Sequence, residues 1–77
     1  MHRYIIRAEW DAEAKVWTAS SEDIPGLVSE AETLEQLIQQ VVDVAPELLA
    51  LNSPGVEIPL PFPLHVLADR LEIVSGR

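Results

Sequence analysis

The side chains of this chain that could carry chemistry are carboxylates, and two pairs of them stand out. Glu22 and Asp23 are adjacent, and Glu30 and Glu32 are separated by one residue. Paired carboxylates can act as general acid and base, and their oxygens are ligands for magnesium. Both pairs fall at predicted turn or strand-end positions, with no histidine ligand, lysine or serine nucleophile motif beside them. We therefore predict a solvated surface with no catalysis, no metal site and no cofactor.

The other residue types used in active sites are isolated. His2 and His65 lie at opposite ends of the chain without ligand spacing, so we expect ordinary surface or strand residues. The three glycines stand singly, and no phosphate-binding loop is predicted. A degenerate nuclease that uses magnesium at Glu22, Asp23 or Glu30 is kept as a third hypothesis, behind two protein-binding ones.

The distribution of charge is more informative than its sum. The formal net charge is -8, and no lysine or arginine occurs between Val16 and Asp69. Nucleic acid is a polyanion that proteins bind with lysine and arginine, so direct DNA or RNA binding is disfavoured. Two interpretations stay open, because acidic residues can keep a small protein in solution or steer a basic protein partner. Under the second, the residues predicted to contact the partner are Trp17, Glu22, Asp23, Glu30 and Glu32.

Length and composition set further bounds. With 77 residues the chain is expected to be a single domain, residues 1–77, near the lower limit of independent stability. Its apolar runs are far shorter than the roughly 20 residues that span a bilayer, and the N-terminus lacks the apolar region of a secretory signal. The chain has no cysteine, which excludes disulfides and thiolate metal sites. We expect a cytoplasmic protein without a membrane segment.

The most informative stretch is residues 17–35, W-T-A-S-S-E-D-I-P-G-L-V-S-E-A-E-T-L-E, which predicts a strand, a turn, a strand and a helix in order. Pro25 presets its own φ angle and Gly26 tolerates a positive one, so we expect a type II turn. Thr33 can accept a hydrogen bond from the first helical turn, and Gln36 can reach back to the Thr33 amide as a capping box. The helix is therefore expected to begin at Leu34.

The flanking segments complete an α+β pattern. Alternation of apolar and polar residues predicts strands over residues 4–10, 16–20 and 27–30, with a polar loop over 11–15. Pro46 predicts a kink near Asp43 or a break into two helices, and residues 52–55 should end the helix. The apolar residues that recur on one helical face, and should cover the sheet, are Leu37, Ile38, Val41, Val42, Ala45, Leu48 and Leu49.

Three features allow more than one interpretation. Trp10 and Trp17 flank the first hairpin and suit either packing within the sheet or the centre of a protein interface. The alternating prolines of residues 58–63 favour an extended strap across the core over a ligand for a proline-reading domain. Residues 64–72 fit either a last strand or a short helix.

The block from Trp17 to Leu37 resembles the core motif of the HicB-like antitoxin family, in which an extended segment, a P-G turn and a T-x-E helix start follow in order. The resemblance implies a β-β-β-α-β fold: a three-stranded antiparallel meander, one long kinked helix on one face, and a last strand beside the first. Two departures matter. Leu27 stands where the family often has a cysteine, and the chain is too short for the DNA-binding domain of many members, which points to a compact stand-alone branch.

The resemblance also implies a function. HicB-like proteins sequester a small basic HicA-type toxin that cleaves RNA, so the leading expectation is a non-catalytic antitoxin. The alternative is a stand-alone homo-oligomeric regulatory or scaffolding domain with an unknown protein partner. In either case we expect a homodimer, because a small sheet covered on one side leaves open edges that a second copy can pair with.

Overall fold

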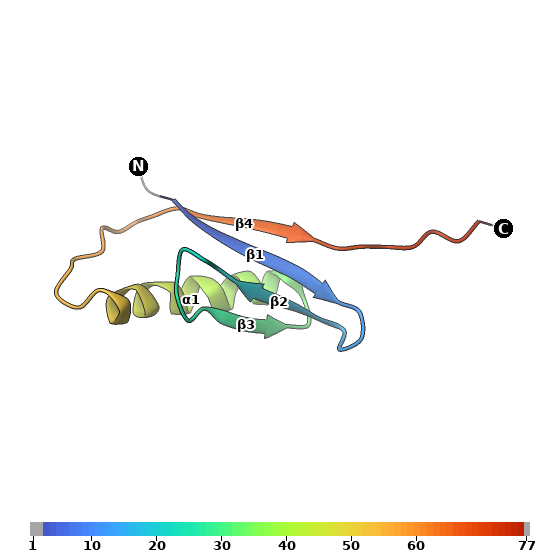
Figure 1. The fold of residues 1–77 in the computed structure, drawn as a ribbon, viewed down its shortest axis with the longest axis horizontal. Helices are drawn as coiled ribbons and strands as arrows, with labels where there is room; N and C mark the ends of the chain where they lie inside the picture. The colour runs from blue at the N-terminus through green and yellow to red at the C-terminus, as the bar shows by residue number, and fades with distance from the viewer. Residues whose placement is uncertain (1–2, 77) are drawn as a thin grey trace.

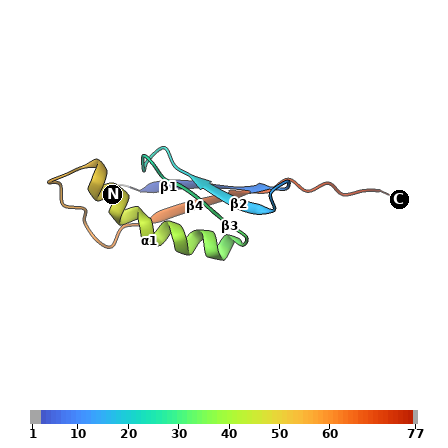
Figure 2. The same cartoon turned by 90° about the horizontal axis from the view of Figure 1, so that it is seen from below.

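The computed structural model describes residues 3–76, which form a four-stranded sheet with a helix on one face (Figures 1 and 2). The strands lie in the order β3-β2-β1-β4; β1 pairs antiparallel with β2, β2 antiparallel with β3, and β4 parallel with β1. This is the α+β, β-β-β-α-β arrangement that was predicted. The elements are β1 (Tyr4–Asp11), β2 (Val16–Ser20), β3 (Val28–Ala31), α1 (Leu34–Asn52) and β4 (Leu64–Asp69).

Strand β1 shows why the alternating pattern forms a sheet with one covered face. Ile6 and Ala8 are fully buried toward the helix, whereas Arg7 and Glu9 between them are exposed on the other face. Successive side chains of a strand point to opposite faces, so the alternation places apolar groups in the core and charges in water. The hairpin to β2 is closed by Asp11, whose Oδ1 accepts hydrogen bonds from the amides two and three residues further along the chain.

The Pro25-Gly26 turn is confirmed. The amide of Leu27 donates to the carbonyl oxygen of Ile24 at 3.2 Å, and Gly26 has φ +85°, as the third residue of a type II turn requires. The predicted start of the following strand was wrong by one residue. The Leu27 amide is used by the turn and its side chain is buried in the core, so ladder pairing begins at Val28, opposite Ser20.

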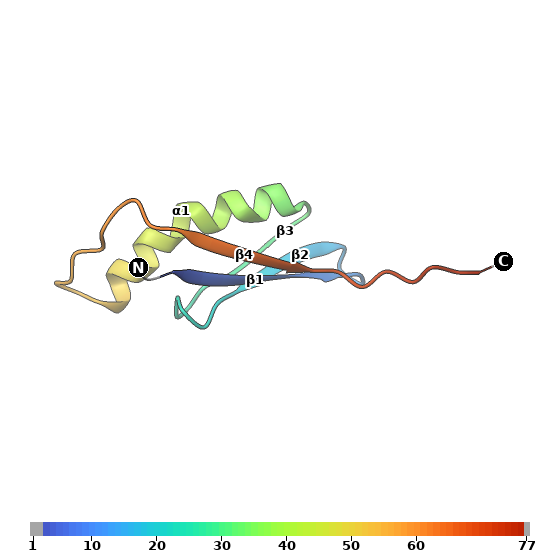
Figure 3. The same ribbon diagram turned by 90° about the horizontal axis from the view of Figure 1, so that it is seen from above.

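The predicted start of helix α1 is confirmed, and so is half of its capping box. Thr33 is extended and its Oγ1 accepts a hydrogen bond from the amide of Gln36 at 3.1 Å. No reciprocal bond from the Gln36 side chain to the Thr33 amide forms between these two described residues. Pro46 does not split the helix, which is continuous to Asn52 and changes direction in its C-terminal half (Figure 3). The amide of Ser53 closes the end by donating to the carbonyl oxygen of Leu49.

The core lies between α1 and the first three strands. The helix packs mainly over β2 and β3, and it contributes every fourth residue of its apolar stripe, from Leu37 to Leu49. Val42, predicted on the covering face, is instead about half exposed, because it lines an open depression between the helix and the segment that leads into β4. In the described chain the buried apolar residues are Ile6, Ala8, Ala19, Ile24, Leu27, Ala31, Leu37, Val41, Ala45 and Leu49.

The C-terminal third joins this unit from one side. The proline-rich strap, residues 58–63, leads into β4, but it is not extended throughout as predicted, because it bends at Leu60 and Pro61, whose peptide bond is cis. Phe62 packs edge-on against Tyr4 with ring centroids 5.1 Å apart. Residues 64–69 form a strand beside β1, which settles the ambiguity between strand and helix. Within residues 3–76, no helix combines the length and apolar character needed to cross a bilayer.

Candidate functional site

A surface depression lies where β3 meets the first half of α1. This acidic groove, as we call it, is open and has a volume of about 540 Å³. Strand β3 and the residue after it supply Glu30 and Glu32, and the helix supplies a row of amide side chains followed by Asp43. The lining residues are Val16, Glu30, Ala31, Glu32, Gln36, Gln39, Gln40 and Asp43.

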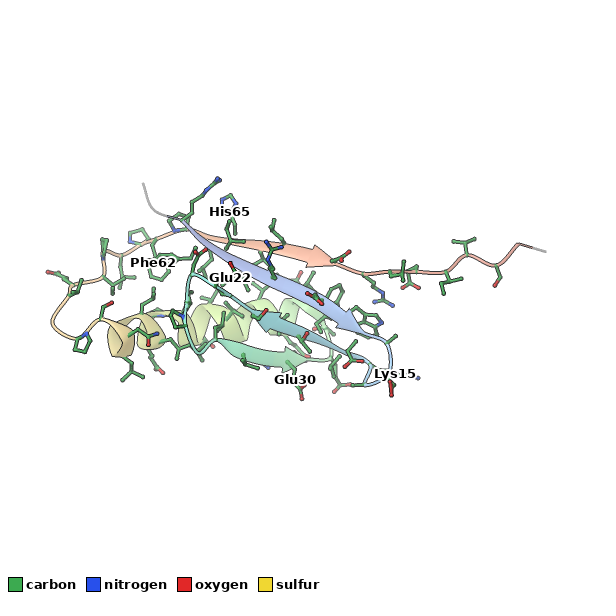
Figure 4. The ribbon with its side chains drawn as sticks, viewed as in Figure 1. Lys15, Glu22, Glu30, Phe62 and His65 are labelled. Atoms are coloured by element: carbon green, nitrogen blue, oxygen red, sulfur yellow. The ribbon has the colours of Figure 1, made fainter. Side chains whose placement is uncertain are left out.

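The groove carries negative charge that no ion pair among residues 3–76 balances. Glu30, Glu32 and Asp43 are exposed, and none of them forms an ion pair with a described residue. Lys15, at the same end of the sheet as Glu30 (Figure 4), is exposed and makes no salt bridge to them. An open acidic surface of this kind favours approach of a basic molecule and disfavours a polyanion.

Hydrogen bonds between side chains order the wall and floor of the groove. The Ser29 hydroxyl donates to Oε1 of Gln40, which joins β3 to the helix. One turn apart on α1, Nε2 of Gln39 donates to Oδ1 of Asp43 at 3.1 Å. These bonds leave most of the carboxylate oxygens free to accept hydrogen bonds from a partner.

Of the five residues predicted to contact a partner, two lie elsewhere. Glu22 and Asp23 follow β2, at the opposite end of the sheet from Glu30 (Figure 4). Oδ2 of Asp23 accepts a hydrogen bond from the amide of Ile5 at 2.8 Å, and the Ser21 hydroxyl donates to the Ile5 carbonyl oxygen. The two side chains thereby satisfy both backbone groups of one β1 residue, so Asp23 has a structural task. The neighbouring Glu22 lines a small depression with Arg7.

The fifth residue, Trp17, lies on the helix side of the sheet. It is half-buried against the core, directly opposite Trp10 across the β1–β2 ladder, and the two rings meet edge to face with centroids 5.6 Å apart. The guanidinium carbon of Arg70 lies 4.2 Å from the centroid of Trp10 and 6.0 Å from that of Trp17. Packing within the sheet, one of the two interpretations of these tryptophans, therefore describes their position, and neither tryptophan lines the groove.

Other candidate chemistry is dispersed. Among residues 3–76, no three His, Cys, Asp or Glu side chains are grouped so that they could hold a metal ion. His65 is exposed on β4. The prediction for His2 concerns a residue outside the described range.

Sequence reasoning missed most of the groove. Gln36, Gln39, Gln40 and Asp43 recur at three- and four-residue intervals, which places them on one polar stripe of the helix. That spacing predicts that they lie together on the solvated side of the helix. What it could not show is that this stripe lies against β3, beside Glu30 and Glu32.

Comparison with known proteins identifies relatives but no activity. A search of the curated proteins found no match. The crystal structure of hypothetical protein TTHA1013 from the extremely thermophilic bacterium Thermus thermophilus is similar, with 35% sequence identity and a TM-score of 0.70 over 97% of this chain and 100% of that one. Residues 3–74 match the model of the family described as "Domain of unknown function (DUF1902)". Since that match spans nearly the whole chain, this protein belongs to the DUF1902 family.

Proposed function

We propose that this protein is a non-catalytic binding module whose acidic groove docks the basic surface of another protein. The observation that carries the proposal is the set of exposed carboxylates at Glu30, Glu32 and Asp43, which lack ion-pair partners within residues 3–76. Electrostatic complementarity would raise the association rate and select a cationic partner. The flanking amide groups of the helix would add hydrogen bonds once that partner is bound.

The finer proposal is that the chain is a compact HicB-like antitoxin of a HicA/HicB-type pair. Its support is the resemblance of the Trp17 to Leu37 block, together with the element order, the Pro25-Gly26 turn and the Thr33 cap. The partner would be a small basic RNA-cleaving toxin in the cytoplasm. An acidic groove that occupies the toxin's basic face would compete with RNA for it, which gives inhibition without any chemistry by the antitoxin.

A second candidate is a stand-alone homo-oligomeric regulatory or scaffolding domain. It is favoured by the exposed aliphatic residues Leu71, Ile73 and Val74 at the C-terminal end, which the domain itself does not cover. The arrangement of genes separates the two candidates. An adjacent short reading frame for a basic protein with a helix-borne histidine favours the antitoxin, and an isolated gene favours the second candidate.

The test is to purify the chain with the small basic protein encoded beside it. We expect a complex at low salt whose dissociation constant rises with ionic strength, and suppression of RNA cleavage by the basic protein. No complex at low salt would contradict the proposal. So would turnover of a substrate by this chain alone, including magnesium-dependent cleavage lost on changing Glu22, Asp23 or Glu30, or binding of bare oligonucleotides at physiological salt.

A charge-matched pair of variants locates the surface. The first combines Glu30→Gln, Glu32→Gln and Asp43→Asn in the groove, and should weaken binding by roughly 10-fold or more if each exposed pair contributes about 0.5–1 kcal/mol. The control changes net charge equally but elsewhere, with Glu9→Gln, Glu13→Gln and Glu57→Gln. We expect the control to weaken binding less than about 3-fold. Equal losses in the two variants would show that net charge, and not the groove, governs binding.

A further inference from the structure

The C-terminal segment, residues 70–76, leaves the sheet at the end of β4 and projects beyond the hairpin (Figure 1). We call this segment the tail. It belongs to no helix, strand or turn, and Leu71, Ile73 and Val74 are 85%, 84% and 92% exposed. The described chain consequently measures 59 Å along its longest axis, with a radius of gyration of 14.7 Å against about 11 Å for a compact domain of this length. Apolar side chains so placed have no partner within the protomer.

The base of the tail is held in line with β4. The Arg70 guanidinium stacks over Trp10 and forms a salt bridge with Glu72. These contacts direct the tail onward along the strand direction instead of back over the sheet (Figures 1 and 3). Residues 64–76 therefore form one nearly straight segment, of which only the first six residues are paired with another strand.

The outer edge of β4 is open and borders an apolar surface. In the strand order β3-β2-β1-β4, β4 is paired on one side only, which leaves a row of backbone donors and acceptors along its other edge. Leu67 is 50% exposed on the face without the helix. On the helix side lies an apolar depression of about 350 Å³, lined by Val42, Pro46, Leu60, Pro61, Phe62 and Leu64.

The distribution of charge differs between the β4 edge and the β3 edge of the sheet. A second copy of the chain also has net charge -8, so two copies repel each other at the β3 edge, where the acidic groove lies. Three of the four lysines and arginines in residues 3–76 lie on or next to β1 and β4, namely Arg3, Arg7 and Arg70. The β4 edge therefore carries less excess negative charge than the β3 edge.

We propose that two copies associate by antiparallel pairing of their residues 64–76 about a two-fold axis close to Arg70. Each tail then runs along the open edge of the other copy's β4. Residues directly opposite in an antiparallel pair project to the same face. With the axis at Arg70, Ile73 of one copy lies opposite Leu67 of the other, and Val74 lies opposite Val66, beside the apolar depression.

The surface available approaches the lower limit for a specific dimer. A fully buried aliphatic side chain removes roughly 60–120 Å² from water, so three from each tail, with the surface that receives them, account for at most about 1,000 Å². Leu67 and Ile73 lie on the face without the helix, so pairing covers them from the side only. Paired backbone adds to this, and specific interfaces begin at about 1,200 Å² in total. The association joins β4 to β4 and leaves the acidic groove free, so it does not depend on the proposed partner.

The first test is the mass of the purified chain in solution, by light scattering and sedimentation at micromolar concentration. We expect twice the protomer mass of 8.5 kDa. Combining Leu71→Glu, Ile73→Glu and Val74→Glu should weaken the dimer at least 100-fold and yield a monomer with an unchanged circular dichroism spectrum. The control, Val28→Glu with Leu51→Glu, alters exposed aliphatics away from the tail and should remain dimeric. A monomeric wild-type chain, or a dimer that survives the tail variant, overturns the proposal.

A second test reports the pairing itself and uses the absence of native cysteine. Leu67→Cys with Ile73→Cys should give disulfide-linked dimers on oxidation, because the two positions face each other across the axis. Six residues of extended chain hold them roughly 20 Å apart within one copy, so the link must join two copies. Val28→Cys with Ile73→Cys should stay unlinked, and linkage in that control at an equal rate contradicts the arrangement. Neither test uses a partner protein, so failure here leaves the proposed function standing.

Discussion

Residues 4–49 and residues 50–76 differ in how far they bury their apolar side chains. The first region contains every buried side chain of the described chain, and its turns and helix start are closed by specific hydrogen bonds. The second contributes only half-buried residues such as Phe62 and Leu64, and it exposes aliphatics along its whole length. The first region thus carries the stability of the protomer, whereas the second presents surface that only another chain can cover.

Charge divides the molecule along the same line. The acidic groove belongs to β3 and α1 of the first region, and the tail and the β4 edge belong to the second. A surface built from solvated carboxylates suits a transient complex, whereas exposed aliphatic side chains suit a stable one. The two surfaces lie on opposite edges of the sheet, so both can be occupied at once.

The largest expected loss of stability comes from a cavity created in the first region. Leu37→Ala removes a side chain that is fully buried between helix and sheet, and should lower the free energy of unfolding by about 2–5 kcal/mol in urea titrations. The same change at the exposed Leu51 should cost less than about 0.5 kcal/mol. Equal losses at the two leucines would contradict the assignment of the core.

A smaller loss is expected from Asp23→Ala, which leaves the amide of Ile5 without its acceptor. Because the bond is charge-assisted but exposed, we expect a loss of about 1–2 kcal/mol in the free energy of unfolding. Glu22→Ala, one residue earlier, should be nearly neutral in the same measurement. If Glu22 proves the more costly of the two, the structural task assigned to Asp23 is wrong.

The helix cap should contribute somewhat less. Thr33→Ala removes the oxygen that accepts from the Gln36 amide, and we expect a loss of about 1 kcal/mol, measured by thermal and urea unfolding. Thr33→Ser keeps the acceptor and should retain most of the stability. A loss of the same size in both variants would point to the Thr33 methyl group and away from the cap.

Neutralising the groove carboxylates should raise the free energy of unfolding, whereas the preceding variants lower it. Combining Glu30→Gln, Glu32→Gln and Asp43→Asn relieves repulsion among exposed carboxylates, so the free energy of unfolding should rise by a few tenths of a kcal/mol at low salt. The gain should disappear at high salt because screening removes the repulsion. A clear loss of stability would mean that these acids support the fold, which would weaken their assignment to partner binding.

The smallest effect is expected from removing residues 71–77. At concentrations where the protomer is monomeric, the free energy of unfolding, followed by tryptophan fluorescence, should change by less than about 0.5 kcal/mol, since the described part of this segment buries no side chain and makes one exposed salt bridge, Glu72 to Arg70. A large loss would show that the tail stabilises its own protomer.

Local chemistry made much of the fold predictable. Pro25-Gly26, Thr33 and the alternation along β1 act within a few residues, so their turn, cap and strand could be predicted before any tertiary contact was known. The remainder depends on segments distant in sequence. Asp23 has its structural task because β1 lies beside it, and the groove exists because one stripe of α1 lies against β3.

The apolar face of the helix shows the limit of what hydrophobic periodicity can predict. It correctly grouped Leu37, Val41 and Leu49 on one side, but it included Val42, whose exposure depends on how far the sheet extends beneath the helix. Periodicity gives the direction of a side chain and not what lies opposite it. For the same reason the composition of the tail indicated neither its projection nor the open edge beside it.

Amide hydrogen exchange of the chain, alone and bound to the basic protein encoded beside it, tests most directly whether the β3–α1 side docks another polypeptide. We predict that binding slows exchange in residues 28–43 by at least about 10-fold beyond any change elsewhere, and leaves residues 64–76 as they are in the free dimer. Protection confined to residues 64–76, or a complex that protects neither segment, would contradict the account.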